Sequence, residues 1–167
     1  MSLVIENGSL VAGANSFVSV AEARAYAEAR ASTLPAENAA VESALIVATD
    51  YLESYRNKFK GSKVDPETQA LQWPRSGVVI EGWEVPEDYI PKELKAAQIQ
   101  LAIEVANGVD LMPTGEGREV IRKKVDVLET AYAPGAGGSP QPVFEKARAL
   151  LTPLLSTSLG AIQVRRI

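Results

Sequence analysis

The chain has 167 residues, of which 46% are hydrophobic and 23% are charged, a composition typical of a globular protein. It has no cysteine and no histidine, which excludes disulfides, thiol catalysis, Cys/His zinc sites and every histidine-based triad. Its 17 basic and 21 acidic residues give a net charge of −4, which argues against a broad cationic surface for nucleic acid. No apolar run approaches the ~20 residues that a membrane span needs, so no membrane partner is expected.

The N-terminal part predicts an extended segment followed by a helix. Residues 2–18 look extended, with a short hairpin around Asn7-Gly8, since both residues tolerate a positive φ. The sequence from Ser19 to Glu22 is a capping box, so a helix is expected to start at Ser19. One face of this helix is mostly alanine, which predicts close approach to another helix. That face carries Val20, Ala23, Ala27 and Ala31.

A second helix is predicted over residues 35–57, with Pro35 in its first turn. Apolar residues recur there at helical spacing, at Val41, Ala44, Leu45, Ala48, Leu52 and Tyr55. The basic stretch 56–63 that follows has two interpretations, a phosphate-binding patch or a cationic helix end that suits the helix dipole. The second is favoured, because most runs of charge are solvated faces.

The middle of the chain predicts short elements. Asp65-Pro66 opens a short helix that ends before Pro74. A second hairpin is expected over residues 78–85, with Glu81-Gly82 between its apolar runs. The acidic residues here suit acid–base chemistry or metal binding, but their spacing matches no known motif, so a solvated loop is favoured. They are Glu81, Glu84, Glu87 and Asp88.

A third long helix is predicted over residues 91–105, capped by Asn107-Gly108. It is apolar on two faces, which predicts either a central helix or a subunit contact. The predicted domains are residues 1–133 with an extended arm at 119–132, a Gly/Pro linker at 134–142, and a C-terminal helix and tail at 143–167. The C-terminal helix has one apolar face, formed by Val143, Ala147, Leu150, Leu151 and Leu154.

These elements predict a mainly α protein, a small helical bundle with short extended hairpins or arms and a C-terminal tail. No Gly-x-Ser-x-Gly elbow and no metal-ligand spacing are present. The sequence leaves a catalytic Ser–Lys pair open as an alternative. We therefore expect no enzymatic activity, no catalytic or metal-binding residue and no cofactor.

Three segments together resemble a phage and prophage family. They are residues 6–8 with 14–23, residues 69–77 around Trp73-Pro74-Arg75, and residues 122–132. Phe17 stands where a Tyr is common in that family, and Asp126 stands where a Gly is usual. The family has been labelled DnaT-like single-stranded-DNA-binding. Its layout is also similar to the head–tail connector proteins (adaptor or head-completion proteins) of tailed bacteriophages, which are small helical bundles that form a ring under the portal.

The connector resemblance implies a structural virion protein, which is the main functional expectation. Its implied partners are eleven further copies of itself in a ring of twelve, the portal protein, and a tail-side neck or tail-completion protein. Genomic double-stranded DNA would pass through the lumen without specific binding. The implied location is the virion neck, and the host cytoplasm before assembly. The alternative is a replication accessory protein that binds single-stranded DNA, which needs a basic groove with aromatic residues.

Three groups of residues are candidates for these roles. The first is the family signature, expected to be structural, with Trp73 as a core anchor and Arg75 stacked on it or paired with an acid. The second is an arm that reaches a neighbouring subunit. The third is a tail that docks on the portal or, in the alternative, adds a strand to its own domain beside residues 2–11. The groups are Asn15, Ser16, Trp73, Pro74 and Arg75; Arg122, Lys123, Lys124, Val125, Val127 and Tyr132; and Ile162, Val164, Arg165, Arg166 and Ile167.

Overall fold

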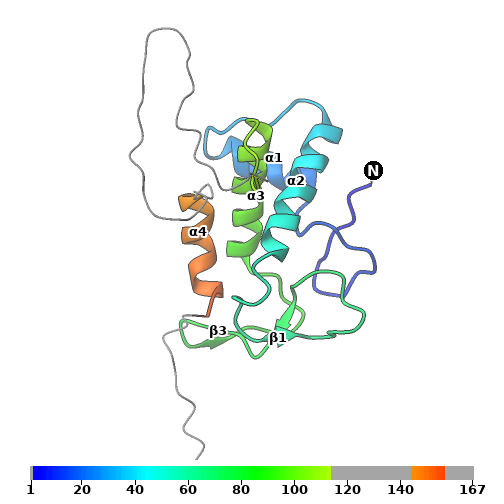
Figure 1. Ribbon diagram of the computed structural model, residues 1–167, viewed down its shortest axis with the longest axis vertical. Helices are drawn as coiled ribbons and strands as arrows, with labels where there is room; N and C mark the ends of the chain where they lie inside the picture. Colours follow the sequence, from blue (N-terminus) through cyan, green and yellow to red (C-terminus); the bar gives the residue numbers. More distant parts are fainter. Residues whose placement is uncertain (1, 114–143, 157–167) are drawn as a thin grey trace, which may run out of the picture.

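The computed structural model describes residues 2–113 and 144–156. In these residues four α-helices form the core, and two short antiparallel strand pairs lie at one end of the molecule (Figure 1). The helical core agrees with the prediction of a mainly α protein, although irregular segments make up much of the rest. The helices are α1 (Val20–Glu28), α2 (Asn38–Glu53), α3 (Lys92–Ala106) and α4 (Glu145–Leu151), followed by a 3-10 turn, η1 (Thr152–Leu154).

Helix α3 is the centre of the fold and packs against α1, α2 and α4. Figure 1 shows it between α2 and α4. Its apolar residues on more than one face are buried, including Leu94, Leu101 and Ala102. Of the two interpretations of its two-faced pattern, the described residues support the central helix.

The predicted capping box at the start of α1 is confirmed. The Ser19 hydroxyl accepts from the Glu22 amide at 3.2 Å, and the Glu22 carboxylate accepts from the Ser19 amide at 2.8 Å. Helix α2 is shorter at both ends than the predicted 35–57. At the first end, the Arg24 side chain donates to the Ala36 carbonyl at 2.7 Å and fixes the segment that precedes α2. At the other end the Ser54 hydroxyl donates to the Tyr51 carbonyl at 2.6 Å, and tighter turns replace the helix.

The predicted hairpin around Asn7-Gly8 is wrong. Residues 4–6 pair instead with residues 15–16, and the intervening loop closes around the buried carboxylate of Glu6. That carboxylate accepts from the amides of Gly8, Leu10 and Val11 at 2.8, 3.1 and 2.9 Å. A buried carboxylate needs such donors, and supplying them takes the backbone amides away from a strand ladder.

The predicted helix at 65–73 is also wrong, because the structure has one turn there. The Asp65 carboxylate accepts from the Glu67 and Thr68 amides at 3.0 and 3.3 Å. The Gln69 side chain then binds the carbonyls of Leu71 and Pro74 at 2.9 and 2.8 Å. These local bonds compete with helix continuation.

The second predicted hairpin is confirmed. β3 (Val79–Ile80) pairs with β4 (Trp83–Glu84), and both turn residues have a positive φ, 50° at Glu81 and 84° at Gly82. This is the type I′ geometry that a two-residue hairpin favours. The other pair joins β1 (Ser62–Lys63) to β2 (Arg75–Ser76).

The C-terminal helix prediction is confirmed where it is described, because Ala147, Leu151 and Leu154 are buried and α4 packs on α3. The arm at 119–132, the linker at 134–142, Val143 and the tail at 157–167 lie outside the described residues. The domain boundaries therefore stay predictions. Within residues 2–113 and 144–156, no helix is long and apolar enough to cross a membrane.

Candidate nucleic-acid interface

The Trp73-Pro74-Arg75 signature lies in the protein interior at the strand-bearing end. Trp73 is fully buried, and its ring meets Phe59 edge to face with the ring centroids 5.9 Å apart. Arg75 is also buried and donates to the carbonyls of Lys60 and Gly61, both at 2.8 Å. Burial lowers the pKa of the Arg75 guanidinium. The central carbon of the guanidinium lies 5.9 Å from the Phe59 ring centroid. The aromatic ring that the Arg75 cation faces is therefore that of Phe59, in place of the expected stacking on Trp73.

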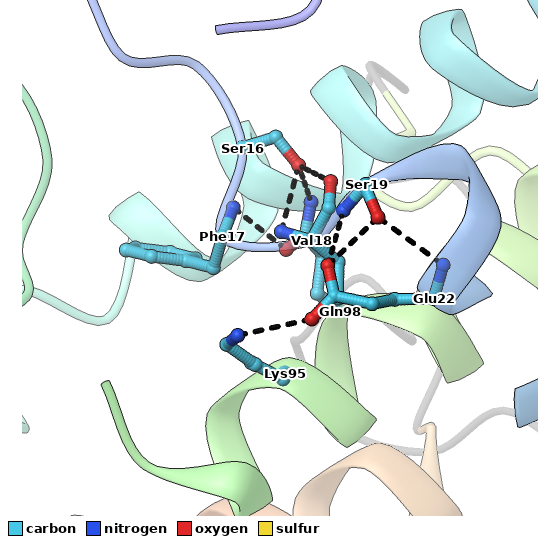
Figure 2. Close-up of polar contacts among 7 residues, drawn as sticks. All are labelled: Ser16, Phe17, Val18, Ser19, Glu22, Lys95 and Gln98. Atoms are coloured by element: carbon cyan, nitrogen blue, oxygen red, sulfur yellow. Dashed lines mark hydrogen bonds and ion pairs between the residues drawn. The ribbon is translucent and has the colours of Figure 1, made fainter. Parts of the chain in front are cut away.

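The Asn15-Ser16 signature anchors the N-terminal segment to the helices. The Asn15 side chain accepts from the Val4 amide at 2.8 Å. The Ser16 hydroxyl accepts from the side chain of Gln98, on α3, at 2.7 Å (Figure 2). The fully buried Gln98 amide also donates to Thr49 at 2.9 Å and accepts from the Phe17 amide at 3.0 Å. These bonds give Asn15 and Ser16 a role in holding the fold.

The basic segment 56–63 is partly used by the protein itself. The Lys60 ammonium donates to the Val79 carbonyl at 3.2 Å, and the Lys63 ammonium donates to the Gln69 carbonyl at 3.0 Å. The Lys58 ammonium lies 4.8 Å from the Tyr55 ring centroid, while Arg56 is exposed. Two of its four cations therefore brace neighbouring loops, which weakens the interpretation of a phosphate-binding patch.

A groove of about 440 Å³ lies between α1 and α3, with a contribution from α4. Its apolar lining and its size suit a nucleobase-like group, and charged side chains surround it. The apolar part comprises Val18, Ala96, Ile99 and Leu150. The remaining lining residues are Glu22, Tyr26, Arg30, Lys92, Glu93 and Lys95.

An aromatic residue and a guanidinium are stacked at this groove. The central carbon of the Arg30 guanidinium lies 3.5 Å from the Tyr26 ring centroid. The Tyr26 hydroxyl accepts from the side chain of Gln100, on α3, at 3.2 Å, which fixes the ring between the two helices. Arg30 also donates to the Tyr26 carbonyl at 3.3 Å. The groove therefore presents a planar cation on a ring that is already held in place.

The other two cations of the groove each have an acidic neighbour. The Lys95 ammonium lies 3.2 Å from the Glu22 carboxylate, as Figure 2 shows, and the Lys92 ammonium lies 3.9 Å from Glu93. Partial burial opposes ionisation of Glu22, but the hydrogen bonds from Ser19 and Lys95 prevail and lower its pKa. The three cations and two carboxylates leave an excess of one positive charge in the groove.

Sequence reasoning missed this groove. It gave no binding role to Tyr26, Arg30, Lys92 or Lys95. The four-residue spacing between Tyr26, on α1, and Arg30, two residues after the end of α1, was the available signal for their contact. Nothing local links this pair to the lysines of α3, because only the packing of α1 on α3 brings them together.

The whole chain, residues 1–167, matches the model of a family described as "Putative DnaT-like ssDNA binding protein". The chain belongs to this DnaT-like family. No curated protein and no solved structure matches it. The family match confirms the DnaT-like part of the resemblance, and no comparison supports the connector part.

The expectation of a bacteriophage virion protein, with its neck, portal-binding and ring-forming roles, is corrected by this finding. The DnaT-like family is described by single-stranded-DNA binding, which was the alternative expectation. The connector resemblance was the only basis for the ring of twelve, the portal and tail-side partners, the double-stranded DNA in the lumen and the two locations. They lose that basis, although no observation tests them directly. The expected lack of enzymatic activity also stays a prediction.

Proposed function

We propose that this DnaT-like protein binds single-stranded DNA and that the α1–α3 groove receives one or more of its bases. The family description supports the activity. The observation that carries the location is the Arg30 guanidinium, stacked 3.5 Å from the Tyr26 ring centroid beside an apolar cavity. Single-stranded-DNA sites combine such stacking surfaces with cations that follow the backbone.

Each part of the groove has a distinct task in this proposal. A base stacks on the Tyr26–Arg30 pair and covers the apolar surface around Ile99, a contact worth about 1–3 kcal/mol per base. Lys92 and Lys95 lie at the same groove and meet the phosphates. Because a base is recognised by its face, this arrangement accepts any sequence.

The charge of the molecule sets how such binding responds to salt. The net charge is −4 and the groove has an excess of only one positive charge, so few counterions are released. Single strands lose affinity with a logarithmic slope of about −0.7 for each phosphate contacted. We therefore expect a shallow salt dependence, with stacking supplying most of the affinity.

The test is a titration of a fluorescently labelled oligothymidine, followed by anisotropy at two salt concentrations. Arg30→Ala removes the stacked cation and is expected to weaken binding roughly tenfold, the equivalent of ~1.4 kcal/mol. Arg56→Ala is the matched control, because it removes the same charge from the exposed part of the basic segment.

The two variants separate the location from the activity. If Arg56→Ala weakens binding and Arg30→Ala does not, DNA binds at the basic segment and the groove assignment is wrong. If the unaltered protein shows no saturable binding at low salt, the proposed activity itself is wrong. Circular dichroism of both variants checks that the helices are intact.

A further inference from the structure

An exposed apolar surface lies on the β3–β4 hairpin, away from the residues that line the groove. Trp83 is 52% exposed and Tyr89 is 39% exposed, and their ring centroids lie 5.7 Å apart in an edge-to-face contact. Val79 is 48% exposed but lies on the opposite face of the hairpin, because its cross-strand partner is Glu84 whereas that of Trp83 is Ile80. We call Trp83 and Tyr89 the hairpin patch. Two aromatic side chains exposed side by side are typical of an interaction surface.

The charge around the hairpin patch indicates what it binds. Four exposed carboxylates lie on the same short segment, at Glu81, Glu84, Glu87 and Asp88. No group of carboxylates in the described part of the chain is placed to hold a metal ion. Such a concentration of negative charge repels the phosphates of DNA. The hairpin patch therefore suits a partner that is both apolar and cationic.

The C-terminal end of the described chain is connected to this hairpin through residues 58–60. Ser156 donates to the Lys58 carbonyl through its amide at 2.7 Å and its hydroxyl at 3.0 Å. The Lys60 amide donates to the Leu154 carbonyl at 3.0 Å, and the Lys60 ammonium reaches the Val79 carbonyl at 3.2 Å. Figure 1 likewise shows the C-terminal end of α4 near β3. Residue 156 therefore lies close to the hairpin that carries the hairpin patch.

We propose that residues 157–167 bind the hairpin patch. These eleven residues contain no acidic side chain, and they carry Ile162, Val164 and Ile167 together with Arg165 and Arg166. Fully extended, eleven residues span up to about 36 Å, which is enough to reach the hairpin patch from Ser156. This occupant differs from both earlier expectations for the tail, the portal and a strand beside residues 2–11.

The chemistry of the two partners is complementary. The arginines pair with the hairpin carboxylates and stack on the Trp83 face, while the aliphatic residues cover the Tyr89 ring. The basic residues at 118–124 are the competing occupant, but their neighbour in the described chain, Pro113, follows the far end of α3 and has no comparable contacts with β3. The exit point at Ser156 therefore favours the tail.

The experiment measures acrylamide quenching of tryptophan fluorescence in the full-length protein without DNA. Trp73 is fully buried, so the accessible signal comes from Trp83, and Trp83→Phe verifies this. The double variant Arg165→Glu/Arg166→Glu is expected to increase quenching of Trp83 and to leave the melting temperature unchanged. Lys123→Glu/Lys124→Glu is the matched control, with the same change of charge, and is expected to leave quenching unchanged.

A charge swap strengthens the test. Adding Glu84→Arg/Glu87→Arg to the tail variant is expected to restore protection of Trp83, because the ion pairs are rebuilt with reversed signs. If the tail variant leaves quenching unaltered, or only the Lys123/Lys124 variant increases it, the proposal is overturned. Since no DNA is present, this result does not depend on the proposed activity.

Discussion

At the scale of single residues, Glu22 has two tasks, capping α1 and pairing with Lys95 of α3. Its pKa in the folded protein lies below the ordinary value of 4.5, because the hydrogen bonds from Ser19 and Lys95 outweigh the effect of partial burial. A lowered pKa means that the ionised carboxylate stabilises the folded state. This stability is present above the pKa of the unfolded chain and is lost as the pH falls through the folded pKa.

We therefore predict that Glu22→Gln destabilises the protein more at pH 7 than at pH 3, because acid protonates a larger share of the Glu22 carboxylate in the unaltered protein. Urea unfolding at the two pH values measures the difference. Glu28→Gln is the control, because Glu28 is an exposed residue of the same helix and should show no such dependence. A loss of equal size at both pH values would show that the carboxylate charge is not the cause.

The same scale shows what the sequence can and cannot predict. The link between Ser19 and Glu22 was predictable because its two members are three residues apart. Asn15 and Ser16 were identified only as part of a family signature with a structural role, since the main partner of Ser16 is Gln98, 82 residues away. No local pattern encodes a hydrogen bond across that distance.

At the scale of elements, the hairpin turn is the clearest case in which residue type and backbone conformation disagree. Both turn positions have a positive φ, which Gly82 adopts freely and Glu81 does not. Asn tolerates this conformation better than Glu. The turn was still predictable, because Gly82 follows a short apolar run and the next run begins directly after it.

Glu81→Asn is predicted to stabilise the protein by about 0.5 kcal/mol through relief of this strain. Glu84→Asn makes the same chemical change within strand β4 and is predicted not to stabilise. Chemical denaturation of the two variants, compared with the unaltered protein, gives the answer. A gain shared by both would point to the removed charge rather than to the turn.

The elements that prediction missed share a cause. The loop at 6–11 and the turn at 65–68 are organised by the carboxylates of Glu6 and Asp65, which collect backbone amides. A hairpin or helix pattern in the sequence counts apolar residues and turn formers, and it gives no weight to a carboxylate that accepts from several backbone amides. Helix existence was therefore predicted better than the irregular segments between helices.

At the scale of the whole molecule, Arg75 joins the turn that follows α2 to the segment that carries Trp73. Its guanidinium donates to two carbonyls at 2.8 Å, those of Lys60 and Gly61, and to Gln72. The end of α2, strands β1 and β2 and Ser156 all meet at this turn. One side chain therefore ties the segment that carries Trp73 to the turn after α2.

We predict that Arg75→Lys destabilises the protein by about 2 kcal/mol, because an ammonium cannot reproduce the fork that binds both carbonyls. Lys63→Arg is a control at a nearby cation with a single carbonyl partner and should have a small effect. Thermal melting compares the two variants. Equal stability of Arg75→Lys and the unaltered protein would show that the fork geometry is not required.

Hydrogen exchange of the Phe17 amide measures how often the core opens. Its proton is held by a side chain, the Gln98 carbonyl oxygen at 3.0 Å, rather than by a backbone ladder. It can exchange with deuterium only when α3 moves away from the N-terminal segment. The exchange rate at this one position therefore reports how often the central helix separates from the chain that precedes α1.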